Sequence, residues 1–146
     1  MTKVLPYDPG VLPSLPAPSA GESVLIEVSG RPPVKDRRQS IRNRNHPLHS
    51  SFVSLRRAAI AAMAGRAWVF GPVEVRIKLF EPEEAEPEPW SMFDYVSGIL
   101  DTLDGSTGNT FTYLPIVFED DCQVRSAQAE WVDAPEIKYS VEIFFR

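Results

Sequence analysis

The chain lacks the features that mark secreted or membrane proteins. It has 146 residues and a single cysteine, Cys122, so no disulfide can form within it. A lone thiol fits the reducing cytoplasm, which is the compartment we expect. No apolar run reaches the roughly 18 residues that a membrane helix needs, and the first residues lack the basic start and apolar core of a signal peptide. We therefore expect one domain with no membrane contact that buries a core without disulfides.

Acidic residues predominate overall but are scarce in one stretch. The net charge is −5, yet residues 30–66 contain nine lysines and arginines and only one acid, Asp36. This stretch carries +8, which leaves −13 for the rest of the chain. Such asymmetry predicts a polyanionic partner, because neutralising phosphates releases counterions.

Residues 31–49, here named the basic segment, are poor in apolar residues and are expected to form a loop. The cations that we expect to contact DNA are Arg31, Lys35, Arg37, Arg38, Arg42 and Arg44. Two alternatives remain open. The segment could be a solvated loop, or it could bind the acidic residues of the same chain.

Hydrophobic residues recur with two periods along the remaining sequence. A period of two predicts strands, as where Val73, Val75 and Ile77 alternate with charged residues. A helical period with capping residues predicts two helices. From the N-terminus, the expected elements are a strand at 24–28, a helix from Ser50 or Ser51 to about Ala64, a strand at 73–79, a helix from about Met92 to Leu103, and strands at 124–131 and 137–145.

The order β-α-β-α-β-β predicts an α+β fold, in which two helices pack on a single mixed four-stranded sheet. Residues 1–22 contain five prolines and are expected to form a flexible N-terminal arm, so the folded domain is 23–146. Ser91, with Asp94 three residues later, predicts a capping box for the second helix. A long loop at 104–118 includes a Gly-Ser-Thr-Gly-Asn stretch that we expect to be mobile.

Two groups of acidic residues could carry chemistry. Asp120 and Asp121 lie where a loop enters a strand, and only one can easily point into a site, because successive strand residues face opposite ways. Asp94, Ser97 and Asp101 are spaced to share one face of the second helix, and Asp104 continues this face. Carboxylates that converge from a helix and a strand could hold Mg²⁺. The alternative is a polar surface in water.

Other reactive residues are expected to have plainer roles. His46 and His49 have no cysteine partners, so a zinc site is not predicted and both should lie at the surface. Cys122 is expected to be a small buried apolar residue.

A set of motifs follows one order along residues 24–145. A strand ends in Gly-Arg-Pro-Pro-Val-Lys-Asp-Arg-Arg; a helix, a strand, a Pro-Trp pair, a helix ending in Asp-Thr-Leu and the sequence Asp-Asp-Cys-Gln-Val come after it. In this order and spacing the chain resembles the RusA-like Holliday junction resolvase family. The resemblance implies a homodimeric, Mg²⁺-dependent endodeoxyribonuclease that cuts branched DNA in recombination and repair.

The family's central motif is Asp-x-Asp-Asn-x-x-Lys, with a further Asp four residues after the Lys. Placed without a gap on this chain, the motif matches at its last aspartate, Asp101. Ser91 and Phe93 stand at the two metal-binding aspartates, and Ser97 stands at the lysine. The resemblance therefore implies the family scaffold with a divergent active site.

The downstream motif Asp-Asp-x-Gln-Val matches, and its second aspartate, Asp121, is a metal ligand in the family. The resemblance thus implies Asp121 and Asp94 as catalytic residues, with Asp94 as a substitute ligand. The predicted metal ligands are Asp121, Asp94 and Asp120, and the predicted supporting residues are Asp101, Ser91 and Ser97.

Three hypotheses follow. The protein is a Mg²⁺-dependent endonuclease with full or reduced activity, or it is an inactive relative that acts as a dimeric DNA-binding or protein-interaction module. The third hypothesis is an unrelated α+β domain whose similarity arose by chance.

Overall fold

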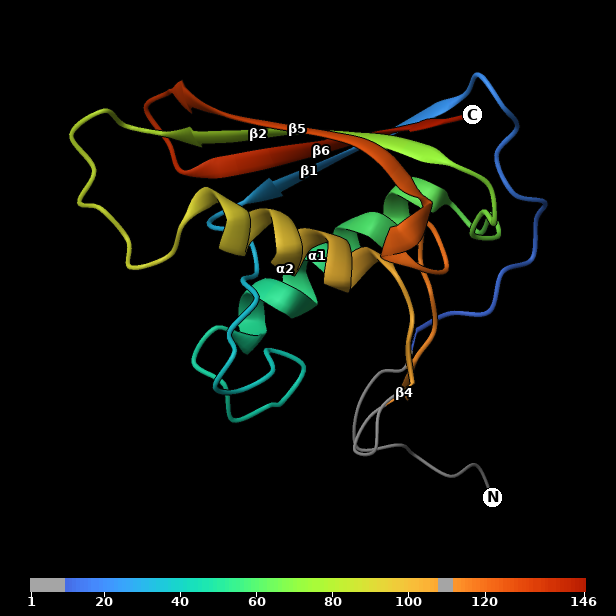
Figure 1. Cartoon of the computed structure of the whole chain (residues 1–146), viewed down its shortest axis with the longest axis horizontal. Coiled ribbons are helices and arrows are strands. Elements are labelled where there is room, and N and C mark those ends of the chain that lie inside the picture. The colour runs from blue at the N-terminus through green and yellow to red at the C-terminus, as the bar shows by residue number, and fades with distance from the viewer. Residues whose placement is uncertain (1–9, 108–111) are drawn as a thin grey trace.

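The computed structural model describes residues 10–107 and 112–146, and Figure 1 shows its architecture. The predicted order β-α-β-α-β-β and the mixed four-stranded sheet are confirmed. The main elements are β1 (Ser23–Ser29), α1 (His49–Met63), β2 (Val73–Glu81), α2 (Met92–Leu103), β5 (Val124–Asp133) and β6 (Lys138–Phe145). The predicted loop at 104–118 also contains two short paired strands, β3 (Ser106–Thr107) and β4 (Thr112–Tyr113).

The large sheet has the strand order β1-β6-β2-β5. β6 lies antiparallel to both β1 and β2, whereas β2 and β5 are parallel and are connected through α2. Both helices lie on one face of this sheet, and no element covers the other face in the described structure (Figure 1). The alternating residues of β2 and β6 that face the helices form the core: Val73, Val75, Ile77, Leu79, Tyr139, Val141, Ile143 and Phe145.

The two helices start differently. α2 begins with the predicted capping box, in which the Ser91 hydroxyl accepts from the Asp94 N–H and the Asp94 carboxylate accepts from the Ser91 N–H. The predicted cap of α1 by Ser50 or Ser51 is wrong. α1 begins at His49, because the turn before it is closed by the bond from the His49 N–H to the carbonyl of His46.

α1 ends where two residues adopt left-handed backbone angles, Ala64 at φ 51° and Gly65 at φ 83°. The Gly65 carbonyl then accepts two hydrogen bonds, each 2.9 Å long, from the N–H groups of Ser14 and Leu15. This part of the predicted N-terminal arm is therefore bonded to the domain. Residues 1–9 of the arm and residues 108–109 of the predicted mobile stretch lie outside the described residues.

Within the described part of the chain, neither helix is long and apolar enough to cross a lipid bilayer.

Candidate metal centre and the basic segment

Three aspartates meet where α2 ends. Asp101 lies in the last turn of α2, Asp104 caps its C-terminus, and Asp121 begins a short 3-10 helix just before β5. A carboxylate oxygen of each lies within 4.8 Å of those of the other two. We name this group the carboxylate triad. It unites two carboxylates of the predicted helix face, Asp101 and Asp104, with Asp121 from the start of the strand, as the sequence predicted.

The backbone explains why the loop after α2 returns to the helix end. The carbonyl of Leu103 accepts two hydrogen bonds of 3.1 Å, from the N–H groups of Ile116 and Val117. The Asp104 N–H still donates to Leu100, as in a helix, so its side chain stays at the helix terminus. Residues far apart in the sequence are thereby fixed in one place.

Asp104 is the buried member of the triad, with 8% of its surface exposed. Burial, followed by the nearby charge of Asp101, raises the pKa of the Asp104 carboxyl to about 7, against the opposing effect of Arg42. Its Oδ1 atom is buried and accepts no hydrogen bond within the described structure. The Arg42 guanidinium lies 3.7 Å away, too far for a hydrogen bond. A buried acceptor without a donor is costly, and a bound cation would remove that cost.

Asp121 and Asp120 have different surroundings. Burial and the neighbouring Asp120 raise the pKa of the Asp121 carboxyl. The Asp120 carboxylate instead accepts from the Cys122 N–H at 2.9 Å, and this bond lowers the pKa of Asp120. Asp120 therefore caps the 3-10 helix, and Asp121 belongs to the triad. The expectation that Cys122 is buried is wrong; it is exposed, because it lies in this turn outside the sheet.

Gln123 fixes the turn that carries Asp121. Its side-chain carbonyl accepts from the N–H groups of Glu119 and Asp120, at 2.8 and 2.9 Å. Its amide donates to the carbonyls of Val69 and Gly71, at 2.9 and 2.8 Å. Sequence reasoning noted Gln123 only as part of a motif; its role required the fold.

The structure places Asp94 and Ser91 away from the triad. Both lie at the first turn of α2, where they bond each other's backbone. Asp94 precedes Asp101 by seven residues, which corresponds to about 10 Å along a helix axis. Ser97 is a partly exposed residue between them. The predicted ligand Asp94 is thus not brought together with Asp121, whereas the predicted supporting residue Asp101 is.

The backbone of the basic segment crosses α2 in close contact with Gly98. A Cβ atom at Gly98 would lie 2.6 Å from the Cα of Val34 and closer still to the backbone of Pro33. Glycine at this position therefore permits the contact. Val34 is fully buried, and the Lys35 N–H donates to the Asp94 carbonyl at 3.0 Å. The segment is ordered and anchored on the helix that ends at the triad.

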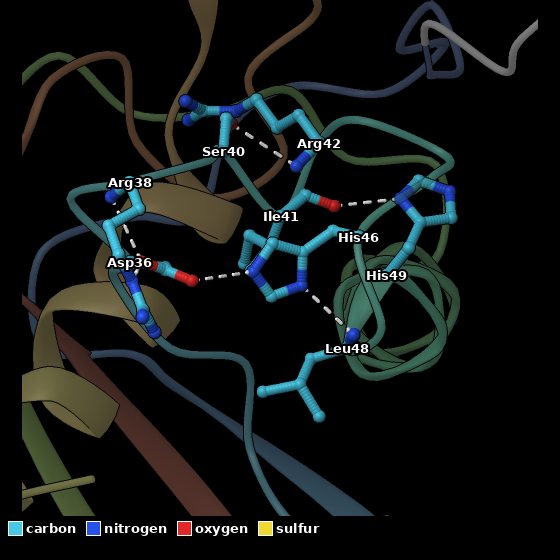
Figure 2. A network of polar contacts seen from close by, with 8 residues as sticks. All are labelled: Asp36, Arg38, Ser40, Ile41, Arg42, His46, Leu48 and His49. Carbon is cyan, nitrogen blue, oxygen red and sulfur yellow. Dashed lines mark hydrogen bonds and ion pairs between the residues drawn. The ribbon is translucent and has the colours of Figure 1, made fainter.

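A polar network holds the rest of the basic segment in shape (Figure 2). His46 lies at its centre, with a 2.9 Å contact from Nε2 to the Asp36 carboxylate. Its Nδ1 accepts from the Leu48 N–H at 2.9 Å, so Nε2 carries the proton and donates to Asp36. The same carboxylate also accepts from the Arg38 N–H, and these two bonds lower the pKa of Asp36.

The expectation that both histidines lie at the surface is wrong for His46, which is 5% exposed. The basic segment has few apolar side chains to bury, and His46 takes a buried position instead. Burial is tolerated because both ring nitrogens have hydrogen-bond partners. His49 is partly buried and bonds the Ile41 carbonyl through Nδ1 at 2.7 Å (Figure 2).

The predicted DNA-contacting cations divide into two groups. Arg31 binds acidic residues of the same chain, Glu81 at 2.9 Å and Glu88 at 3.0 Å. Arg42 donates to the Asp101 carbonyl and lies beside Asp104. The exposed cations are Lys35, Arg37, Arg38 and Arg44. The first group positions the chain, and the second is accessible to a ligand.

A cavity of about 400 Å³ lies between the basic segment and α2. It is lined by Lys35, Arg37, Arg38 and Arg42, and by one triad residue, Asp101. Cations that attract an anion and one residue of the carboxylate triad therefore border the same space. We name it the triad cavity.

A scan against protein-family models and a search among curated proteins found no match to this chain.

Proposed function

We propose that the protein is a divalent-metal-dependent endonuclease that acts on DNA through the carboxylate triad and the triad cavity. The observation that supports this most strongly is the buried Oδ1 of Asp104. It accepts no hydrogen bond within the described structure, and it belongs to a group of three carboxylates beside a cation-lined cavity.

The triad suits a hard cation such as Mg²⁺, which prefers a few carboxylate oxygens and retains several waters. Oxygens bound at about 2.1 Å to one octahedral ion stand about 3.0 Å apart as neighbouring ligands and about 4.2 Å apart as opposite ones. The triad oxygens, which lie within 4.8 Å of one another, would draw together by side-chain rotation when an ion binds. A bound cation would activate water and neutralise charge on the scissile phosphate.

The protein's own residues divide the remaining work. Asp101, Asp104 and Asp121 hold the metal. Lys35 and Arg37 bind and orient the phosphate in the triad cavity, because guanidinium and ammonium groups are strong donors to phosphate oxygens.

The resemblance to RusA-like resolvases supports branched DNA as the substrate and a homodimer as the active form. It also distinguishes this site from the family pattern. The family's two metal-binding aspartates correspond to Ser91 and Phe93, at the start of α2, and two of the three triad aspartates, Asp101 and Asp104, lie at the end of the same helix. We therefore propose a metal site that has moved along α2.

A second candidate function is DNA binding without cleavage. It is favoured by Ser97 at the family's lysine position and by Arg42, which partly neutralises Asp104 where a metal would sit. In this case the triad and Arg42 would form a structural charge cluster. The basic segment would still bind phosphates.

The experiment is cleavage of a four-way DNA junction and a matched linear duplex, with and without Mg²⁺. The proposal expects Mg²⁺-dependent cleavage that is lost in Asp121→Asn and Asp104→Asn. Asp133→Asn is the matched control, because Asp133 lies at the far end of β5 from Asp121. Asp94→Asn discriminates between sites, since loss of cleavage there would favour Asp94 as a ligand.

Binding without cleavage at high protein concentration would support the second function. Binding should weaken steeply with salt, and Arg37→Ala and Arg38→Ala should weaken it for all sequences. If the protein binds no DNA at low salt, both proposed functions are refuted.

A further inference from the structure

A second, smaller cavity lies between the end of the basic segment and α1. It has a volume of about 190 Å³, and its lining includes Arg44, His49, Arg57 and the buried Arg56. None of the described residues that line it is acidic. The triad cavity, by contrast, includes the carboxylates of Asp36 and Asp101.

Two aromatic rings contact the buried arginine in the wall of this cavity. Arg56 is 4% exposed, and its guanidinium lies 4.7 Å from the ring centre of Tyr113 and 5.6 Å from that of Phe52. The two rings meet edge to face at 5.2 Å. His49 donates through Nδ1 to the Ile41 carbonyl, and this bond orients its ring at the cavity.

The two cavities are neighbours. Phe52, which is 2% exposed, lines both of them, so its ring forms part of the partition between them. Arg42 lines the triad cavity and Arg44 lines the second one, and one residue, Asn43, lies between them in the chain. A strand bound with one phosphate in the triad cavity could reach the second cavity with another.

We propose that this second cavity is a phosphate-binding subsite for a nucleic-acid strand whose scissile phosphate lies in the triad cavity. The proposal rests on the proposed function. A guanidinium presents its donors in a flat fork that matches two phosphate oxygens, so Arg44 and Arg57 are suited to this ligand. The exposed position of both guanidiniums leaves them accessible from solvent.

The first arm of the test uses inorganic phosphate alone, without metal, and follows side-chain signals by NMR. We expect saturable shifts of the His49 ring and of the Arg57 Nε–H group. In Arg57→Ala the His49 shift should be lost. Arg76→Ala is the matched control, because Arg76 is an exposed arginine on the face of the sheet away from both helices. The absence of saturable shifts in the unmodified protein would overturn the subsite.

The second arm measures duplex and junction binding in EDTA at several salt concentrations. Each phosphate contact contributes about 0.9 to the slope of log affinity against log salt. Arg57→Ala and Arg44→Ala should each reduce the slope by about 1, and Arg76→Ala should leave it unchanged. An unchanged slope in both variants, with phosphate shifts intact, would overturn nucleic acid as the ligand and assign the cavity to a free phosphate compound.

Both arms are run without metal, so a failure of cleavage does not affect them. If the protein shows no Mg²⁺-dependent cleavage but phosphate shifts and a reduced salt slope are found, the nuclease proposal is refuted and the subsite is retained. If the protein cleaves DNA but neither phosphate shifts nor a reduced slope is found, the subsite is refuted and the nuclease proposal is retained.

Discussion

Replacement of Asp104 by asparagine should stabilise the metal-free protein at alkaline pH. The carboxyl has a pKa of about 7 in the folded protein against an ordinary value of 3.8. A difference of this size corresponds to a loss of at most about 4 kcal/mol of folding stability once the group is ionised. Nearby solvent screens part of this cost, so we expect Asp104→Asn to gain about 2 kcal/mol at pH 8.

The sign depends on pH. Below about pH 4, Asp104 is protonated in both the folded and the unfolded chain, and its stability contribution is fully present. Between pH 4 and pH 7 the unfolded chain has released the proton and the folded chain retains it, so stability falls as the pH rises. At pH 5 only about a third of this window has been crossed, so Asp104→Asn should gain clearly less stability there than at pH 8.

Urea denaturation at pH 5 and pH 8 measures this effect, with Asp133→Asn as the control. Mg²⁺ adds a second test, because a ligand of the folded state raises its stability. It should stabilise the unmodified protein at pH 8 and should not stabilise Asp104→Asn. An effect of Asp104→Asn that is equal at both pH values would refute the burial argument for this carboxyl.

Three other substitutions test the packing around the site by urea denaturation. Gly98→Ala should cost about 3 kcal/mol, because its new methyl group would overlap the backbone of Pro33; a neutral result would mean that the basic segment does not cross α2 there. His46→Ala should cost about 3 kcal/mol and weaken phosphate binding, because the buried ring is bonded to Asp36; unchanged stability would remove its positioning role. Ser91→Ala should cost about 1 kcal/mol through loss of the capping box, and a change in metal affinity instead would connect Ser91 to the site.

Much of the architecture could be predicted from the sequence because it depends on local periodicity. The alternation of Val73, Val75 and Ile77 predicts a strand that is buried on one side, and the structure has this strand. Ser91 and Asp94 form a capping box three residues apart, which needs no tertiary information. Order, helix number and sheet type follow from such signals.

The site was less accessible, because it depends on chain segments that meet only in the fold. Asp121 reaches Asp101 and Asp104 because the loop after α2 returns to the helix end, and no local pattern encodes that return. His46 is buried because it bonds Asp36 before it and Leu48 after it in the basic segment. Residue type alone does not predict these partners. Helical spacing made Asp94 a candidate ligand, while its position three residues after Ser91 also predicted a capping role. The structure has the capping role.

The most direct test of the proposed metal site is a crystal soaked with Mn²⁺, whose anomalous scattering locates the ion without ambiguity. The account predicts one ion bound by carboxylates of Asp101, Asp104 and Asp121, with Arg42 displaced from Asp104. An ion between Asp94 and Asp121, or no ion at the triad in crystals grown above pH 8, would contradict it.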